Sequence, residues 1–389
     1  MKICACIAEY NPFHLGHLKH IEYMKNTLGA EKVVVIMSGN FTQRGEIAIL
    51  DKFTRARHAI IAGADVVIEL PTVFATANAE SFAKGGVKII NDLGVASGLC
   101  FGVESGKKED YISLAKAMNN ESKEFKRVLK DKLENGVSLA KAKFETVNAL
   151  GGEFDGSLIS SPNNILGLEY VKALLKYDSD IPPFPMIREG DHNDLTLKKG
   201  VTSATSIRQA IALGNVKKTK KNVPPFVYKD LGDYPFAFDK VCMSKVITSS
   251  AQDIALAPDC TEGLENRIKA FSKDNHSIYE LVEKVSTKRY TKTRVQRILT
   301  ANLLGITEKF LLECLDSALY AKILAVNSNS KDLIPLITKN SKIPVLTRKS
   351  DASQLKKTAE KCFELDTLAS DLYALITGKK QNEHHMLIV

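Results

Sequence analysis

Two histidines, His14 and His17, are the residues of this chain whose types and spacing are best suited to chemistry. They lie in the segment EYNPFHLGHLKH, residues 9–20, with Gly16 between them. Two imidazoles at the start of a helix, beside backbone N–H groups that attract anions, suit a polyphosphate whose bridging oxygen gains charge as it leaves. Such a pair also occurs by chance, so the elements around it must decide between the two interpretations.

The residues around the histidines predict a tight turn from a buried strand into a helix. Residues 3–8 form a short apolar run typical of a buried strand, and Asn11 with Pro12 marks a turn. Apolar residues then recur at helical spacing over residues 18–24. This setting favours the functional interpretation of the histidines.

Short β-branched runs alternate with helical segments through the first half of the chain. Strands are expected over 32–37, 65–70 and 98–103, with helices over 51–62 and 79–93. Parallel neighbours need such crossovers, so the pattern predicts an α/β fold with a Rossmann-like, parallel, doubly wound sheet. Ligands of these sheets bind beyond the carboxyl ends of the strands, where the histidine segment falls.

The rest of the chain predicts a boundary and a second domain. Residues 107–150 are expected to be helices packed on the sheet, and 183–189 a last strand. Gly214, the lysine-rich run 217–221 and the prolines at 224 and 225 suggest a boundary. We therefore expect an ATP-binding catalytic domain over 1–215 and a mainly helical domain over 216–389. Helical spacing is found over 262–271, 277–285, 292–304 and 319–326, and a small α/β element is expected near 343–346.

Composition describes an ordinary globular protein with a basic balance. The 389 residues are 44% hydrophobic and 25% charged, with a formal net charge of +9, which favours a polyanionic partner. Seven cysteines without a C-x-x-C spacing argue against a disulfide framework and a structural zinc site, so we expect no metal ligands. No apolar run is long enough for a membrane span, and a cytoplasmic location is expected.

A second helix start, SATSIR at residues 203–208, offers partners for a triphosphate. Arg208, with Thr205 and Ser206, would hold its β/γ end, while His14 and His17 contact it from the other side. The alternative for SATSIR is a plain serine-capped helix with a solvated arginine. The pairing of this helix with HLGH is similar to that in the nucleotidylyltransferase superfamily, which favours the phosphate role.

Four residues at strand ends and helix starts are candidate walls of the nucleotide pocket. Gly102 would let the nucleotide approach the backbone, and Asn163 could hydrogen-bond ribose or base. Arg188 could reach phosphate, and Glu189 a ribose hydroxyl or a water on magnesium. On residue type alone, Asn163 could equally be a plain capping residue. Arg188 and Glu189 could equally be solvated residues at the end of a strand.

The segment 284–297 concentrates positive charge at a predicted helix start. Cations there oppose the helix dipole, so nearby phosphates explain them better than helix stability does. An aromatic side chain among them could stack on an unpaired base. A solvated basic face is the alternative. The candidate RNA-binding residues are Lys288, Arg289, Tyr290, Lys292, Arg294 and Arg297.

Over nearly its full length the chain resembles the bacterial tRNA(Met) cytidine acetate ligases. The resemblance is carried by EYNPFHLGHLKHI, SGNFTQRGE (38–46), DVVIELP (65–71), SPNNILGLEY (161–170), SATSIR and YTKTRVQRIL (290–299). Ile47 stands where the family often has proline, a change in a loop that affects no catalytic group.

The resemblance implies an ATP-dependent ligase. Acetate would be activated to acetyl-adenylate with release of pyrophosphate, and the acetyl group transferred to N4 of the wobble cytidine of elongator tRNA(Met). Mg²⁺ would accompany the ATP. The implied ATP site comprises Ile7, Ala8, Glu9, Tyr10, Asn11, Pro12, Phe13, His14, Leu15, Gly16, His17, Leu18, Lys19, His20, Gly102, Asn163, Arg188 and Glu189.

Two alternatives stay open at this point. One is a nucleotidylyltransferase acting on a small phosphorylated cofactor, which would not need the basic second half. The other is a non-catalytic RNA-binding protein with a vestigial nucleotide fold, against which intact His14, His17 and Arg208 argue.

Overall fold

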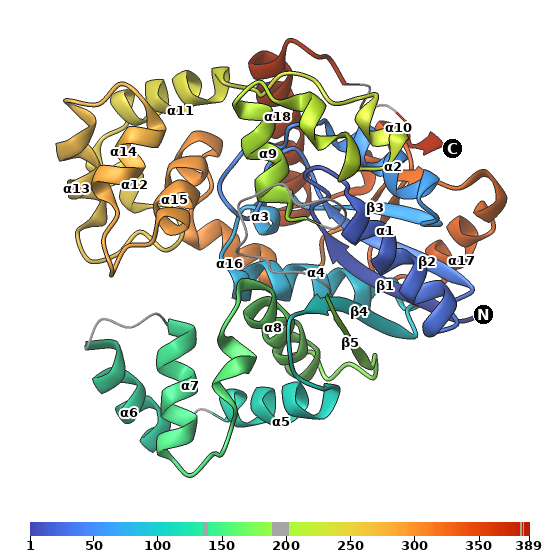
Figure 1. Ribbon diagram of the computed structural model, residues 1–389, viewed down its shortest axis with the longest axis horizontal. Coiled ribbons are helices and arrows are strands. Elements are labelled where there is room, and N and C mark those ends of the chain that lie inside the picture. The colour runs from blue at the N-terminus through green and yellow to red at the C-terminus, as the bar shows by residue number, and fades with distance from the viewer. Residues whose placement is uncertain (121, 135–138, 189–201, 382, 384) are drawn as a thin grey trace.

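The computed structural model describes residues 1–120, 122–134, 139–188, 202–381, 383 and 385–389. Its centre is one mixed sheet in the strand order β5-β4-β1-β2-β3-β6-β7, with β8 paired to β6 (Figure 1). The strands are β1 (Ile3–Ala8), β2 (Lys32–Ser38), β3 (Val66–Leu70), β4 (Gly98–Val103), β5 (Pro183–Ile187), β6 (Ala321–Val326), β7 (Val345–Leu346) and β8 (Leu387–Ile388).

The five strands from the first half are all parallel, which confirms the predicted α/β, doubly wound fold. The run of five apolar residues 33–37 in β2 is buried throughout, as expected for a strand covered on both faces. The pairing of β1 with β2 brings Ala8 level with Met37, so the chain leaves both strands at the same edge of the sheet. The histidine segment begins at that edge.

The prediction of a helix over residues 319–326 is wrong. Residues 321–326 form β6, a fully buried strand that lies antiparallel to β3. A short run that is apolar except for Lys322 fits a helical period as well as a strand. Its partner β3 lies more than 250 residues earlier in the sequence. The sheet thus includes strands from both sides of residue 215, and the division of the chain at that point stays a prediction.

Helices cover both faces of the sheet and form two groups beside it. Those of the first half are α1 (Leu15–Glu22), α2 (Lys52–Ile61), α3 (Thr72–Ala75), α4 (Ala79–Leu93), α8 (Pro162–Lys176) and α9 (Ala204–Ala212). Three further helices form a lobe at the bottom of Figure 1: α5 (Lys108–Asn119), α6 (Lys123–Glu134) and α7 (Leu139–Ala149). Helix α5 packs against α8, so the lobe is attached to the body through that helix.

The second half is mainly helical, as predicted. Its helices are α10 (Pro225–Tyr228), α11 (Ala237–Thr248), α12 (Ala251–Ala255), α13 (Leu264–Ser272), α14 (Ile278–Val285), α15 (Lys292–Leu304), α16 (Glu308–Asp316), α17 (Leu333–Asn340) and α18 (Thr358–Thr377). Helices α11 to α15 form the group at the left of Figure 1. None of the helices in the described part of the chain is both long and apolar enough to cross a membrane.

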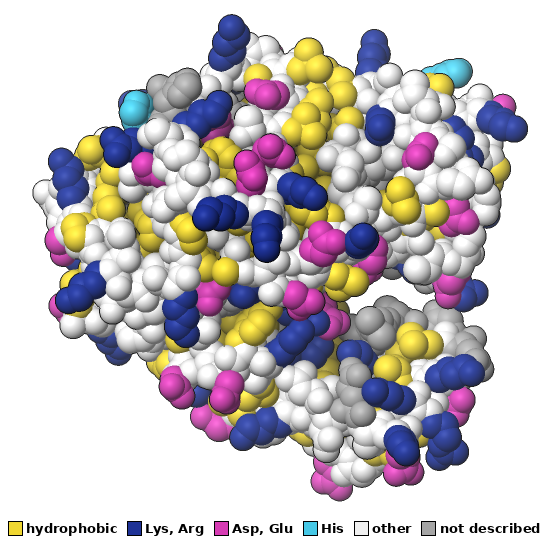
Figure 2. All heavy atoms as spheres, turned by 180° about the vertical axis from the view of Figure 1, so that it is seen from behind, with side chains coloured by type: hydrophobic (Ala, Val, Ile, Leu, Met, Phe, Trp, Pro, Cys, Tyr) yellow, Lys and Arg dark blue, Asp and Glu magenta, His cyan; other side chains and the backbone are white. Residues whose placement is uncertain are grey.

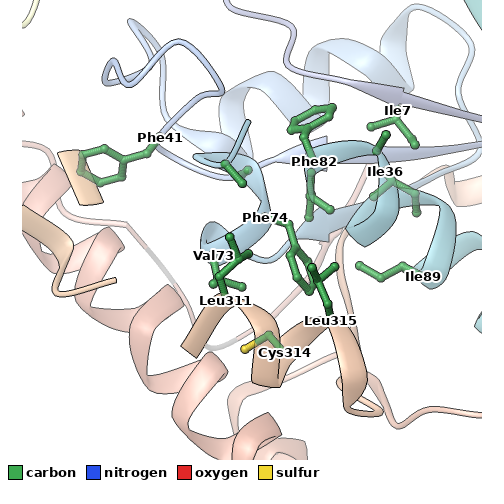
Figure 3. Packing of buried hydrophobic residues seen from close by; sticks show 14 of the residues in the cluster. Ile7, Ile36, Phe41, Val73, Phe74, Phe82, Ile89, Leu311, Cys314 and Leu315 are labelled. Atoms are coloured by element: carbon green, nitrogen blue, oxygen red, sulfur yellow. The ribbon is translucent and has the colours of Figure 1, made fainter. Parts of the chain in front are cut away.

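One hydrophobic core joins the two halves of the chain. Figure 3 shows Leu311, Cys314 and Leu315 of α16 lying against Val73 and Phe74 of α3, all of them buried. Burial of apolar surface at this contact contributes roughly 25 cal/mol per Å². The second half is therefore held to the end of β3, next to the edge from which the histidine segment leaves the sheet.

Candidate active site

A cavity of about 570 Å³ lies at the carboxyl ends of the parallel strands. Its walls come from the segments after β1 and β2, from the ends of β4 and β5, and from α4, α8, α9 and α15. Open α/β sheets bind ligands at this edge, and a cavity of this volume suits a nucleotide.

The two histidines are fixed by the start of α1. His14 is the N-cap, and its Nδ1 accepts a hydrogen bond from the N–H of Gly16 at 3.0 Å. His17 Nδ1 in turn accepts from the N–H of His14 at 3.2 Å, and the two rings stack with centroids 3.7 Å apart. Since each Nδ1 accepts, the proton of each neutral imidazole is on Nε2. Two Nε2–H donors side by side in the cavity are suited to phosphate oxygens.

Arg208 lies in the same cavity and is held in place by the histidine segment. Its Nη1 donates to the carbonyl of Asn11 at 2.9 Å, and its Nη2 lies 3.4 Å from Glu46 Oε2 and 3.5 Å from Thr205 Oγ1. Only 6% of the residue is exposed. Ser203 caps α9 by accepting from the N–H of Ser206 at 3.1 Å. SATSIR is thus a serine-capped helix start whose arginine is buried beside the histidines and not solvated.

Arg55 is a structural residue of the site that sequence reasoning missed. Its guanidinium is fully buried and donates to the carbonyl oxygens of Glu9, Ser38, Gly39 and Leu50. These carbonyls belong to the segments that leave β1 and β2, so one side chain holds both loops at the edge of the sheet. The available signal was that Arg55 falls among the apolar positions of a predicted helix, where a side chain is expected to be buried.

Residues at the ends of β4 and β5 form the opposite wall. Arg188 lines the cavity beside Gly102, where an added Cβ would lie 2.9 Å from Arg188 Cδ. Burial lowers the pKa of Arg188, and Glu104 opposes the shift. Asn163 Nδ2 donates to Glu104 Oε1 at 2.6 Å at the start of α8, which Ser161 caps as expected. Glu189 lies outside the described residues.

The pKa of His20, a third histidine of the cavity wall, is lowered by burial. Its Nε2 lies 3.2 Å from Cys100 Sγ, and the ring lines the cavity. Burial, reinforced by the charge of Arg188, lowers the pKa of His20 to about 4. The ring is therefore neutral at pH 7, and it adds a polar but uncharged side chain to a cavity wall that also carries the guanidinium groups of Arg188 and Arg208.

The structure brings most of the predicted ATP-site residues to this one cavity. Those that line it are Ile7, Ala8, Glu9, Tyr10, Asn11, His14, Gly16, His17, His20, Gly102, Asn163, Arg188, Thr205 and Arg208. Pro12, Phe13, Leu15, Leu18, Lys19 and Ser206 do not line it. Phe13 instead packs on Tyr10 with ring centroids 4.8 Å apart and so supports the wall from behind.

The predicted RNA-binding residues divide into two sets. Arg297 reaches the cavity together with Thr291 and Thr293, two wall residues that sequence reasoning missed. The others lie outside the cavity, and several have partners within the chain. Arg289 pairs with Glu262, Lys292 Nζ lies 2.5 Å from Glu283 Oε1, Arg294 donates to the carbonyl of Asp259, and Tyr290 Oη donates to the carbonyl of Glu262, whereas Lys288 is exposed.

Ion pairs within the chain thus provide a second explanation for part of the positive charge of this segment, which residue types alone could not distinguish from RNA contacts.

Among the residues that the structure describes, no group of three or more His, Cys, Asp or Glu side chains could hold a metal ion.

The fold and the site are those of a nucleotidyltransferase, and the family model described as HIGH Nucleotidyl Transferase matches residues 1–386. The chain is 40% identical to the tRNA(Met) cytidine acetate ligase of Acetivibrio thermocellus, over 96% of this chain and 95% of that protein. It is 37% identical to the protein of the same name from Clostridium novyi, over 97% and 96% of the two chains. The chain belongs to the family of the tRNA(Met) cytidine acetate ligases.

Two solved structures agree with this assignment. The apo crystal structure of Thermotoga maritima TmcAL superposes with a TM-score of 0.93 at 26% identity and covers the whole of both chains. A second structure of the same protein, bound with alpha-thio ATP, gives a TM-score of 0.91 at 26% identity, again over both whole chains.

Proposed function

We propose that this chain uses ATP to activate acetate and transfers the acetyl group to N4 of the wobble cytidine of elongator tRNA(Met). The observation that carries the proposal is the convergence of three donors, the Nε2–H groups of His14 and His17 and the guanidinium of Arg208, on one cavity large enough for a nucleotide. The curated relatives are named for the same ligation, and a related structure holds an ATP analogue.

The first half-reaction follows from these donors. An acetate oxygen attacks the α-phosphorus of ATP, the bond from that phosphorus to the bridging oxygen breaks, and pyrophosphate leaves with the negative charge. Donors aimed at the phosphates stabilise this charge, and removal of one such donor typically costs a factor of about 10²–10³ in rate. Acetate is ionised at neutral pH, with a pKa of roughly 4, so the attack needs no general base. This agrees with a site dominated by imidazoles and guanidinium groups.

The second half-reaction places the cytidine N4 amine against the acetyl carbonyl. The new C–N bond forms as the C–O bond of the mixed anhydride breaks, AMP leaves, and the proton that N4 loses passes to solvent. To reach the adenylate, the base must leave the anticodon stack. The second half of the chain contributes to the cavity wall through Thr291, Thr293 and Arg297. We propose that the RNA enters the cavity on this side. We propose that Lys288, Arg289, Tyr290, Lys292, Arg294 and Arg297 contact this RNA.

Mg²⁺ would reach the site with the triphosphate. Since the described residues contain no cluster of metal ligands, the phosphate oxygens and water would supply most of its coordination. The ion would neutralise phosphate charge, and the chain's own donors would orient the α-phosphate. Because tRNA and ATP are both cytoplasmic molecules, we also propose that the reaction takes place in the cytoplasm.

Acetate-dependent exchange of pyrophosphate into ATP tests the first half-reaction without RNA. We expect exchange with acetate, and transfer of labelled acetyl to tRNA(Met) when the RNA is added. His17→Ala should lower the exchange about 100-fold, and His276→Ala, at an exposed histidine, serves as the matched control. Turnover of a phosphorylated cofactor without exchange on acetate would contradict the proposal and favour the alternative nucleotidylyltransferase activity.

A further inference from the structure

The loop between β2 and α2 places a carboxylate behind Arg208. Glu46 Oε2 lies 3.4 Å from Arg208 Nη2, and 21% of the Glu46 side chain is exposed. Gln43 and Arg44 of the same loop line the active-site cavity, whereas Glu46 does not. Glu46 therefore contacts the arginine without contacting the space where a nucleotide would bind. We name residues 41–47 the Glu46 loop.

Hydrogen bonds within the Glu46 loop give it a closed shape. Phe41 and Ile47 face each other in an antiparallel bridge at its base. The N–H of Thr42 donates to the carbonyl of Glu46 at 3.0 Å, and the N–H of Gly45 donates to the carbonyl of Thr42 at 2.9 Å. Gly45 has a φ of +72°, a conformation that favours glycine. The backbone of Glu46 therefore has a defined place beside Arg208.

Helix α15 of the second half supports the Glu46 loop from outside. The fully buried hydroxyl of Thr300 donates to the carbonyl of Gly45 at 2.7 Å. A Cβ added to Gly45 would lie 2.5 Å from the backbone N of Arg297, so the two backbones are in direct contact. Phe41 packs on Phe238 of α11 with ring centroids 6.3 Å apart. The second half of the chain thus sets the place of the loop.

A tyrosine of α14 and one from the segment before α11 lie near the same carboxylate. Tyr234 Oη and Tyr279 Oη are 3.2 Å apart. Burial and then the negative charge of Glu46 raise the pKa of Tyr234, and Arg208 opposes the shift. The charge of Glu46 also raises the pKa of Tyr279, after the larger effect of burial. The second half therefore reaches the pair of Glu46 and Arg208 through these tyrosines as well as through α15.

The group of helices α11 to α15 meets the active site through the start of α15. Thr291, Thr293 and Arg297 line the cavity there. Figure 2 shows the surface hollowed between this group and the lobe of α5 to α7, so on this face the group is joined to the body and not to the lobe. The Glu46 loop lies at that junction, between α15 and Arg208.

We propose that Glu46 is a positioning residue, which orients the guanidinium of Arg208 toward the phosphates and is itself fixed by α15 through Gly45. Arg208 Nη1 donates to Asn11, while Glu46 and Thr205 lie beside Nη2, so both ends of the planar fork are held. Arginine has five N–H donors, and these contacts leave others for phosphate. A donor that is oriented before ATP binds needs no reorganisation during the reaction. This inference rests on the proposed function and deepens it.

A double-mutant cycle on acetate-dependent pyrophosphate exchange tests the proposal. Glu46→Gln keeps the shape of the side chain and removes its charge. It should lower exchange about tenfold, less than loss of Arg208 itself would, because Asn11 still holds part of the guanidinium. In an Arg208→Met background the same change should cause no further loss, since the group to be positioned is gone. An equal loss in both backgrounds would overturn the proposal, because Glu46 would then act independently of Arg208.

Asp230→Asn is the matched control for Glu46→Gln. The carboxylate of Asp230 is 31% exposed and lies 2.6 Å from Arg57 Nη2 and 2.7 Å from His58 Nε2, yet none of these residues lines the active-site cavity. We expect exchange by this variant to match that of the unmodified chain. A loss as large as that in Glu46→Gln would mean that any broken ion pair lowers exchange, and it would overturn the specific role of Glu46.

Thr300→Val tests the support from α15 without a change of charge. It removes the hydroxyl that donates to Gly45 and should lower exchange about threefold, since other hydrogen bonds still close the loop. Thr146→Val is its control, because Thr146 is equally buried and donates to the carbonyl of Ala142 at the same 2.7 Å, within α7. Both variants should lose similar stability in urea, and only Thr300→Val should lose exchange. Equal exchange in the two variants would refute the support by α15.

Affinity for ATP, measured by calorimetry, gives a second readout that does not depend on acetate. Glu46→Gln should weaken ATP binding about threefold and should have no effect once Arg208 is replaced by Met. Tighter binding by Glu46→Gln would mean that the carboxylate acts only as a negative charge that repels the triphosphate, and it would overturn the proposal. An unmodified chain that binds ATP but does not exchange on acetate would refute the proposed function alone, and the binding cycle would still decide the role of Glu46.

Discussion

Replacement of His14 by asparagine should separate its structural role from its chemical one. Nδ1 of His14 caps α1 by accepting from the N–H of Gly16 at 3.0 Å, while Nε2 carries the proton proposed to meet phosphate. The amide oxygen of asparagine takes the position of Nδ1 and is a preferred cap, but the side chain ends short of Nε2. Alanine removes both functions.

The expected magnitudes follow from these two contacts. His14→Ala should lose about 1 kcal/mol of folding free energy with the cap, which is about 1 °C in Tm for a chain of this length. His14→Asn should retain that stability. Both variants should lower acetate-dependent pyrophosphate exchange about 10²–10³-fold, or about 3–4 kcal/mol of transition-state stabilisation. Binding of tRNA should be largely retained.

Urea unfolding and the exchange assay on both variants check the argument. Exchange in His14→Asn within threefold of the unmodified chain would refute the role of Nε2. A loss of stability in His14→Asn equal to that in His14→Ala would refute the capping role of Nδ1.

Three further predictions concern buried ionisable groups. Arg208→Lys should lower pyrophosphate exchange about 100-fold, because an ammonium cannot reproduce the planar fork that now donates to Asn11; equal kcat in the two proteins would contradict this. Lys52→Met should lower the unfolding free energy in urea by about 3 kcal/mol, since the fully buried Lys52 lies 2.8 Å from Glu69; a neutral effect would mean that the remaining charges compensate. The pKa of His20 is lowered from 6.5 to about 4, so the folded state binds this proton less well than the unfolded state does. Its contribution to stability is present above pH 6.5 and is lost as the pH falls toward 4. In His20→Leu the unfolding free energy should therefore depend less on pH between 6.5 and 4. An unchanged dependence of the unfolding free energy on pH would exclude this linkage.

The nucleotide half of the site could be predicted because its signals are local. The strand before His14, the turn at Pro12 and the helix after it are adjacent in sequence, and their periodicities are those of the elements that form. The serine that caps α8 and the helix over residues 292–304 were found on the same grounds.

The errors and omissions arise where distant segments meet. The strand β6 was expected as a helix because its apolar run is short and its partner β3 is far away in sequence. The position of Arg55 within the apolar spacing of a predicted helix could indicate burial, but the loops after β1 and β2 that it joins are known only from the structure. The ion pair of Arg289 with Glu262 could not be foreseen, because the two residues lie 27 positions apart, and RNA binding by this basic segment stays a prediction.

By itself, the sequence determined the order of strands and helices around the nucleotide site and the types of groups available for chemistry, because capping, turns and hydrophobic period act over a few residues. Only the tertiary structure decided which of those groups face one another. It brought Arg208 to His14 across nearly two hundred residues and directed Arg297 into the same cavity. Such placements depend on long-range packing and on the burial of charge, and their energies are set by neighbours that the linear order of residues does not show.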